Sequence, residues 1–119
     1  MTTTGAQLQG PYRLSLDDVD ALVSRRSAGV YALGRADAHK RFCVNLVGRS
    51  DSDIRALLLD YLGFDSLFKF DYSASSRAAF ETECALFHEF RLSGSQLHPT
   101  SPEGTSLRCP VCGVQAERR

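Results

Sequence analysis

The chain has 119 residues, of which 43% are hydrophobic and 24% are charged, and its 14 basic residues balance its 14 acidic ones. This length corresponds to one domain, and this composition excludes collagen-like, coiled-coil and strongly disordered chains. The zero net charge also disfavours a protein that binds nucleic acid through bulk positive charge.

The first ten residues are polar and lack the apolar region of a signal peptide. No apolar run reaches the ~20 residues that a membrane-spanning helix requires. We therefore expect a cytoplasmic protein without a membrane partner. Because residues 1–10 are rich in Thr, Gln and Gly, we expect them to form a flexible N-terminus.

Hydrophobic periodicity and capping residues predict six elements in the rest of the chain. The first is a helix capped by Ser15 and closed by Arg25 and Arg26, and two strands follow it over 29–33 and 42–47. Next come a helix that is capped by Asp51 or Ser52 and ended by Gly63, and a strand over 67–72. The last is a helix capped by Ser73, Ser75 or Ser76 that runs to about Phe90. The sequence thus predicts an α+β domain over 11–91, with a small three-stranded antiparallel sheet flanked by helices. An irregular tail follows over 92–119, rich in Pro, Gly and Ser.

The tail contains a Cys-x-x-Cys pair, Cys109 and Cys112. In a reducing compartment this spacing indicates a pair of metal ligands first and a redox pair second. A structural zinc site requires four ligands. Cys84 and His88 lie four residues apart on the last predicted helix, so their side chains share one face of it.

We therefore predict a zinc site formed by Cys84, His88, Cys109 and Cys112, which attaches the tail to the helix and adds stability. His98 is a competing ligand. The alternative for the helix pair is that Cys84 is a small buried hydrophobe and His88 a surface histidine. Cys43, inside a predicted strand, is expected in the core.

Four pieces of sequence occur in an order that points to a known family. Gly29-Val30-Tyr31 opens one strand, Leu46-Val47-Gly48 ends the next, Arg55 follows in a helix and Glu83 lies on the last helix. This order and spacing resembles the GIY-YIG nuclease family over about residues 29–90. The tail, with its predicted zinc ligands, looks like that of a zinc-hooked subgroup of such domains.

The resemblance implies an active site for phosphodiester hydrolysis that uses one Mg²⁺ or Mn²⁺ ion. It implies that Glu83 binds this ion, that Arg55 holds the phosphate, and that Tyr31 hydrogen-bonds the attacking water or acts as its general base. Gly48, Arg49 and Tyr61 are then expected to contact the substrate.

Each of these assignments has a plain structural alternative. Glu83 is otherwise a solvated helix residue, with Glu81 as the alternative carboxylate. Arg55 is otherwise a surface charge, and Tyr31 a core aromatic residue. Leu46 departs from the family pattern, because it stands where the second motif has a tyrosine and cannot donate a hydrogen bond or carry a proton.

Three functions are consistent with these features. The first is a metal-dependent nuclease acting on DNA or RNA, with DNA favoured. The second is a catalytically degenerate relative that binds nucleic acid or a protein partner, with zinc as a structural element. The third is a zinc-stabilised module without nuclease chemistry. The sequence predicts no particular oligomeric state.

Overall fold

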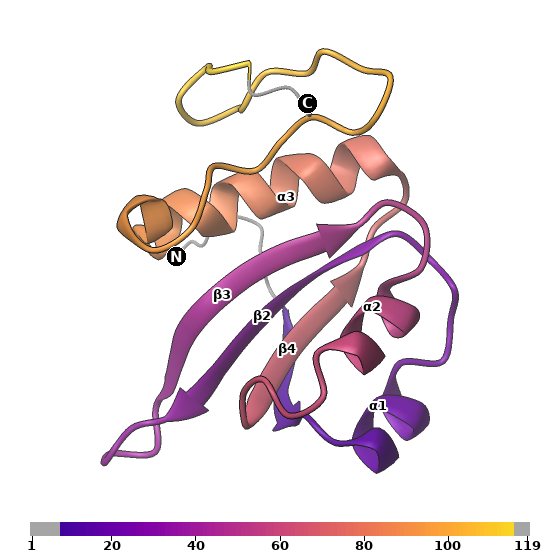
Figure 1. Cartoon of the computed structure of the whole chain (residues 1–119), viewed down its shortest axis with the longest axis vertical. Helices are drawn as coiled ribbons and strands as arrows, with labels where there is room; N and C mark the ends of the chain where they lie inside the picture. The colour runs from indigo at the N-terminus through magenta and orange to yellow at the C-terminus, as the bar shows by residue number, and fades with distance from the viewer. Residues whose placement is uncertain (1–7, 116–119) are drawn as a thin grey trace.

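The structure, a computed structural model, describes residues 8–115. In chain order its elements are β1 (Gln9–Arg13), α1 (Leu16–Leu22), β2 (Gly29–Ala36), β3 (Phe42–Ser50), α2 (Ile54–Asp60), β4 (Leu67–Tyr72), α3 (Ser76–Glu89) and the short 3-10 helix η1 (Leu92–Gly94). Helix α3 lies across one face of the sheet, and α1 and α2 lie on the other face (Figure 1).

The sheet is antiparallel, with the strand order β1-β4-β2-β3. The predicted α+β class with an antiparallel sheet is confirmed, but the prediction of three strands is wrong. The additional strand, β1, pairs with β4 at the edge of the sheet and carries an irregularity between Gln9 and Tyr12. Gly10 has a positive φ of 114° and Pro11 follows it. Such residues break the alternating pattern that identifies a strand in sequence. Residues 1–7 of the predicted flexible N-terminus lie outside the described residues.

Polar side chains cap the three α-helices. The hydroxyl groups of Ser15 and Ser75 accept backbone N–H bonds from Asp18 and Ala78, as the sequence predicts for α1 and α3. Helix α2 is capped by Asp53, one residue beyond the predicted caps. The predicted last turn of α1 differs too, because the helix ends at Leu22, before the arginine pair.

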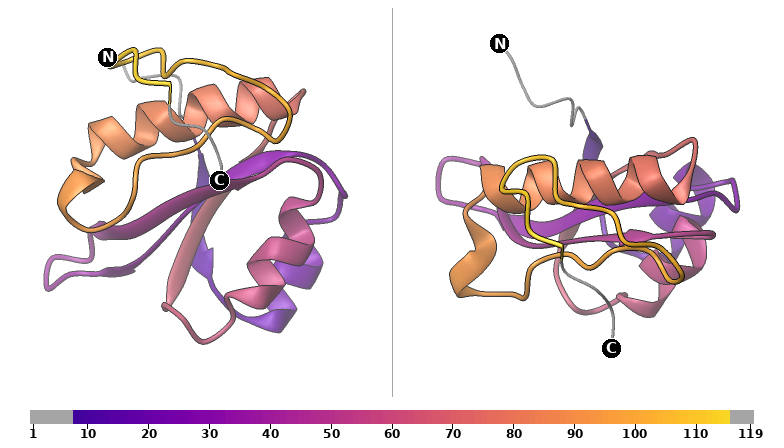
Figure 2. Two further views of the ribbon diagram at one scale, coloured as in Figure 1. Left: turned by 45° about the horizontal axis from the view of Figure 1, so that its top comes forward. Right: turned by 90° about the horizontal axis from the view of Figure 1, so that it is seen from above.

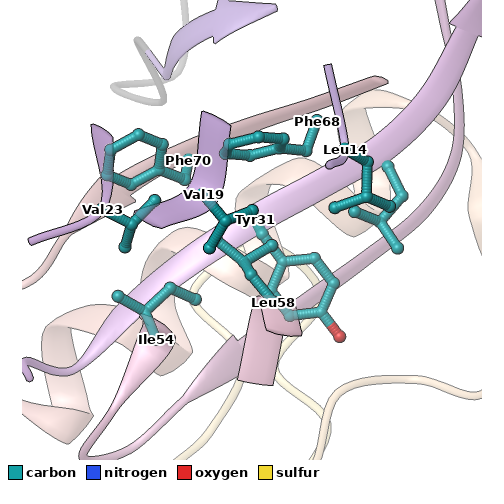
Figure 3. Packing of buried hydrophobic residues seen from close by; sticks show 9 residues of the cluster. Leu14, Val19, Val23, Tyr31, Ile54, Leu58, Phe68 and Phe70 are labelled. Atoms are coloured by element: carbon teal, nitrogen blue, oxygen red, sulfur yellow. The ribbon is translucent and has the colours of Figure 1, made fainter. Parts of the chain in front are cut away.

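The apolar core forms two layers, one on each face of the sheet. The layer under α1 and α2 includes Leu14, Val19, Val23, Tyr31, Leu33, Ile54, Leu58, Phe68 and Phe70. Figure 3 shows the Tyr31 ring within this layer and its hydroxyl oxygen pointing out of it. The layer under α3 includes Ala28, Val30, Ala32, Val47, Ala79, Leu86, Phe87 and Leu92. Tyr31 therefore combines a buried ring with a polar group at the rim of the core.

After η1 the chain turns back along α3 (Figures 1 and 2). Between residues 95 and 115 it forms no further helix or strand, as predicted for the tail. The side-chain amide of Gln96 donates to the carbonyl of Val47 at 3.0 Å and accepts from its N–H at 3.1 Å. This side chain thus satisfies backbone groups at the open edge of β3. Within the described residues, no helix has the length and apolar character needed to cross a membrane.

Candidate active site and metal centre

An open pocket of about 280 Å³ lies at the outer edge of β3. Its walls come from β2, β3, the end of α2, the middle of α3 and the tail. The lining residues are Tyr31, Leu46, Val47, Gly48, Arg49, Tyr61, Glu83, Leu97, His98, Pro99 and Thr100. The pocket therefore brings together five of the six residues that the sequence predicts for catalysis and substrate binding.

The Tyr31 side chain reaches the pocket because Gly48 has no side chain to block it. The two residues are paired across β2 and β3. A Cβ atom on Gly48 would lie 2.2 Å from the Tyr31 hydroxyl oxygen, which is too close for any side chain. The Tyr31 ring also contacts the ring of Tyr61, with centroids 5.6 Å apart. Burial first, and then a hydrogen bond with Tyr61, raise the pKa of Tyr31, so its hydroxyl stays protonated.

Arg49 and Glu83 form a buried ion pair beside this tyrosine. Arg49 Nη1 donates to Glu83 Oε1 at 2.7 Å, and Arg49 Nε donates to Asp51 Oδ1 at the same distance. Neighbours on a strand point to opposite faces, so Arg49 points toward α3 while Gly48 faces Tyr31. Burial raises the pKa of Glu83, although the bond to Arg49 opposes the increase. Burial lowers the pKa of Arg49, but its bonds to Asp51 and Glu83 outweigh this and raise it overall.

Arg55, the arginine that the resemblance selects, lies elsewhere. Its guanidinium group bonds to Asp20 of α1, across the contact between the first two helices. The arginine that lies at the carboxylate is Arg49, which the sequence analysis expected only as an additional substrate contact. The alternative carboxylate, Glu81, pairs with Arg77 at 3.2 Å on the exposed side of α3. The geometry therefore favours Glu83 over Glu81 as the acidic residue of the pocket.

A second group of side chains is suited to hold a metal ion. One ligand atom from each of His88, His98, Cys109 and Cys112 lies within 4.8 Å of the others. His88 Nε2 is buried and has no hydrogen-bond partner among the described residues. His98 Nδ1 bonds to the carbonyl of Pro99 at 2.7 Å, which leaves Nε2 facing Cys112 Sγ at 3.5 Å. Two imidazole nitrogens and two thiolates are a ligand set compatible with zinc.

Hydrogen bonds hold the Cys-x-x-Cys turn in a conformation that suits a pair of metal ligands. The N–H of Val111 donates to Cys109 Sγ at 3.4 Å, and the chain closes the turn with a bond from Gly113 N to the Cys109 carbonyl. Burial acts to raise the pKa of Cys109, but bonds from the backbone of Cys112 and Val111 lower it to about 6. Cys109 is therefore readily available as a thiolate.

Cys84 lies outside this group of four, whereas the sequence analysis placed it among the ligands. It is buried with Phe80 and Cys109, and burial first, then its contact with Cys109, raises the pKa of its thiol. His98, the competing candidate, fills the fourth position. The prediction that Cys43 is a core residue is wrong, because it is exposed on the outer strand β3.

His98 belongs to both sites. It lines the pocket together with Glu83 and also supplies a nitrogen to the group of four. Gln96, which bonds to Val47 beside the pocket, is a residue that the sequence analysis missed, because a polar residue in an irregular tail carries no local signal. A scan of protein-family models, a search of curated proteins and a search of solved structures find no match to this chain.

Proposed function

We propose that this domain is a metal-dependent nuclease of the GIY-YIG type that hydrolyses phosphodiester bonds in DNA or RNA. The observation that supports this best is the meeting of Tyr31, Arg49 and Glu83 in one open pocket. Tyr31 and Arg49 come from the consecutive strands β2 and β3, and Glu83 comes from α3, which is distant from both in the sequence. A hydroxyl, a guanidinium and a buried carboxylate are the groups that phosphoryl chemistry requires.

The residues of the pocket divide the chemistry among them. A divalent cation such as Mg²⁺ or Mn²⁺, held by the Glu83 carboxylate, would polarise a phosphate oxygen and acidify a water molecule. The raised pKa of Tyr31 keeps its hydroxyl protonated, so it orients a water by hydrogen bonding. Arg49 donates one N–H to each of two carboxylates. Its remaining N–H groups are available to the negative charge that develops on the phosphate.

The group of four ligands serves a different purpose in this proposal. His88, His98, Cys109 and Cys112 would hold one zinc ion in tetrahedral geometry. Since all four ligands come from protein, no position is open for a substrate, and the site is structural. The zinc would attach the tail to α3, and its binding free energy would contribute to the stability of the fold.

A second candidate function is supported by one feature of the charges. The guanidinium of Arg49 is paired with two carboxylates and that of Arg55 with Asp20, so neither arginine offers an unbalanced positive charge to a phosphate. Leu46 also lines the pocket where the family pattern has a tyrosine. These features favour a catalytically degenerate domain that binds nucleic acid or a protein partner and does not hydrolyse phosphodiester bonds.

Cleavage assays separate the two functions. The full chain is incubated with end-labelled DNA and RNA in Mg²⁺, in Mn²⁺, and with all divalent cations removed by a chelator. The nuclease proposal predicts cation-dependent cleavage that Tyr31→Phe lowers by about 10²-fold, the size of a lost contact that positions the attacking water. Tyr12→Phe is the matched control, because Tyr12 packs against Phe68 and Phe70 on the other edge of the sheet. Binding without cleavage supports the degenerate domain instead.

Zinc content tests the metal centre separately. The purified protein should contain one zinc ion per chain, and Cys112→Ser should lose it. Cys43→Ser is the matched control, because both cysteines are exposed but Cys43 lies on β3, outside the group of four. Equal zinc content in the two variants would exclude this site.

A further inference from the structure

A short segment of the tail, residues 96–100, forms one wall of the pocket. Leu97, His98, Pro99 and Thr100 all line it. We call these five residues, from Gln96 onward, the strap. The strap has no helix or strand of its own, and besides the backbone bond from Gln96 N–H to the Leu92 carbonyl, two side-chain contacts hold it.

The first contact is at Gln96. Its side-chain amide makes both a donor and an acceptor bond to the backbone of Val47, at 3.0 and 3.1 Å. Val47 is the residue before Gly48, so this pair of bonds holds the strap next to the place where the Tyr31 hydroxyl emerges. A side-chain amide reproduces here the bonding of a neighbouring strand.

The second contact is at His98. Its ring packs edge-on against Phe87 and His88 of α3, with centroids 5.1 and 5.3 Å away. Its Nε2 faces Cys112, and its Nδ1 bonds to Pro99 in the strap. A metal ion in the group of four would therefore fix the strap at its centre, between α3 and the cysteine turn.

We propose that the structural metal positions one wall of the active-site pocket through the strap, with His98 and Gln96 as positioning residues. This inference rests on the proposed zinc centre and, for its functional meaning, on the proposed nuclease function. Neither residue needs to touch the reacting phosphate. Their role is to set the distance between the strap and the side chains of Tyr31 and Tyr61, which line the same pocket.

The tyrosines of the chain provide a direct measurement. The protein has four of them and no tryptophan. Tyr31 and Tyr61 line the pocket, whereas Tyr12 and Tyr72 lie on β1 and β4, away from it. Full-length protein labelled with 3-fluorotyrosine would give four ¹⁹F NMR signals, assigned by single Tyr→Phe substitutions. Two of the signals report on the pocket and two serve as internal controls.

Two variants test the two contacts. Gln96→Ala should keep one zinc per chain, while the signals of Tyr31 and Tyr61 shift and those of Tyr12 and Tyr72 do not. His98→Ala should lose zinc and shift the same two signals. His98→Cys, which restores a fourth ligand, should recover zinc and return both signals toward their wild-type positions.

Two results would overturn the proposal. If the pocket signals do not move in Gln96→Ala and His98→Ala, the strap does not set the pocket. If all four signals collapse when zinc is lost, the metal supports the whole core rather than the strap. Both readouts are made without nucleic acid, so a failure of the nuclease proposal would appear as absent cleavage with these signals unaffected.

Discussion

Arg49, next to last in β3, and Glu83, in the middle of α3, are joined by an ion pair of 2.7 Å in which each side chain is 10% exposed. The pair links the outer strand of the sheet to the helix that covers it, and it forms the boundary between the core and the pocket. A second carboxylate, Asp51, holds the other side of the same guanidinium. Two consequences follow, one for stability and one for pH dependence.

Removal of Arg49 should destabilise the fold strongly. Arg49→Ala leaves the Glu83 carboxylate buried without its partner, and breaking a buried pair from one side costs about 3 kcal/mol or more. Arg77→Ala is the matched control, since the pair of Arg77 with Glu81 is exposed and worth about 0.5 kcal/mol or less. Urea unfolding followed by circular dichroism measures the loss of unfolding free energy in each variant. A loss in Arg49→Ala no larger than that in Arg77→Ala would mean that the pair is not buried in solution.

The stability of the protein should depend on the ionisation of Glu83. The folded state raises the pKa of this carboxyl above its ordinary value of 4.5, chiefly through burial. Its contribution to stability is therefore fully present below about pH 4.5 and is lost as the pH rises through the folded-state pKa. Unfolding free energies of wild type and Glu83→Gln are measured across this range without added Mg²⁺ or Mn²⁺. The unfolding free energy of wild type minus that of Glu83→Gln should fall as the pH rises.

The opposite slope would contradict the predicted increase in the pKa of Glu83. A difference that increases with pH would show that the Arg49 ion pair outweighs burial and lowers the pKa of Glu83 below the ordinary value. The other titrating groups, including the cysteines and histidines of the metal centre, are common to both proteins and cancel in the difference.

A side chain at Gly48 should destabilise the fold. A Cβ atom there would lie 2.2 Å from the Tyr31 hydroxyl oxygen and 2.5 Å from the ring carbon that carries it. Tyr31 is only 4% exposed, so it cannot move aside freely. Gly48→Ala should therefore cost about 1–3 kcal/mol, as overpacking does. Gly94→Ala, where a Cβ meets nothing within 4 Å, is the control. Thermal unfolding of both variants checks this, and equal midpoints would contradict the close approach.

The two candidates for the fourth metal ligand should behave differently. Cys84→Ala should retain one zinc per chain with weaker affinity, because Cys84 contacts the ligand Cys109 rather than joining the group of four. His98→Ala should lose the zinc. Zinc release titrated with a chromogenic chelator measures both affinities. Loss of zinc in Cys84→Ala with full retention in His98→Ala would restore the ligand set expected from sequence.

Local signals in the sequence predicted most of the fold. The caps at Ser15 and Ser75 and the alternating strand β4 depend on neighbouring residues, and they are found where they were expected. Strand β1 was missed because its partner, β4, lies far away in the sequence and its own pattern is broken by Gly10 and Pro11.

The residues of the pocket and of the metal centre could be predicted only in part, because they too depend on contacts between distant segments. The helical spacing of Cys84 and His88 shows that they share a face, but only the path of the tail decides which of them meets the cysteine turn. That path brings in His98 instead. Likewise, motif order selects Arg55, whereas the alternation of side chains along β3 turns Arg49 toward Glu83. Contacts between distant segments decided each of these cases.

Single-turnover cleavage of a labelled oligonucleotide in Mn²⁺ tests most directly whether the Glu83 pocket hydrolyses phosphodiester bonds, as we propose. Glu83→Gln keeps the shape of the side chain and removes its charge, and Glu81→Gln makes the same change two residues earlier on the exposed side of α3. We predict a loss of about 10²-fold or more in Glu83→Gln and a wild-type rate in Glu81→Gln. Equal rates in wild type and Glu83→Gln would contradict the account.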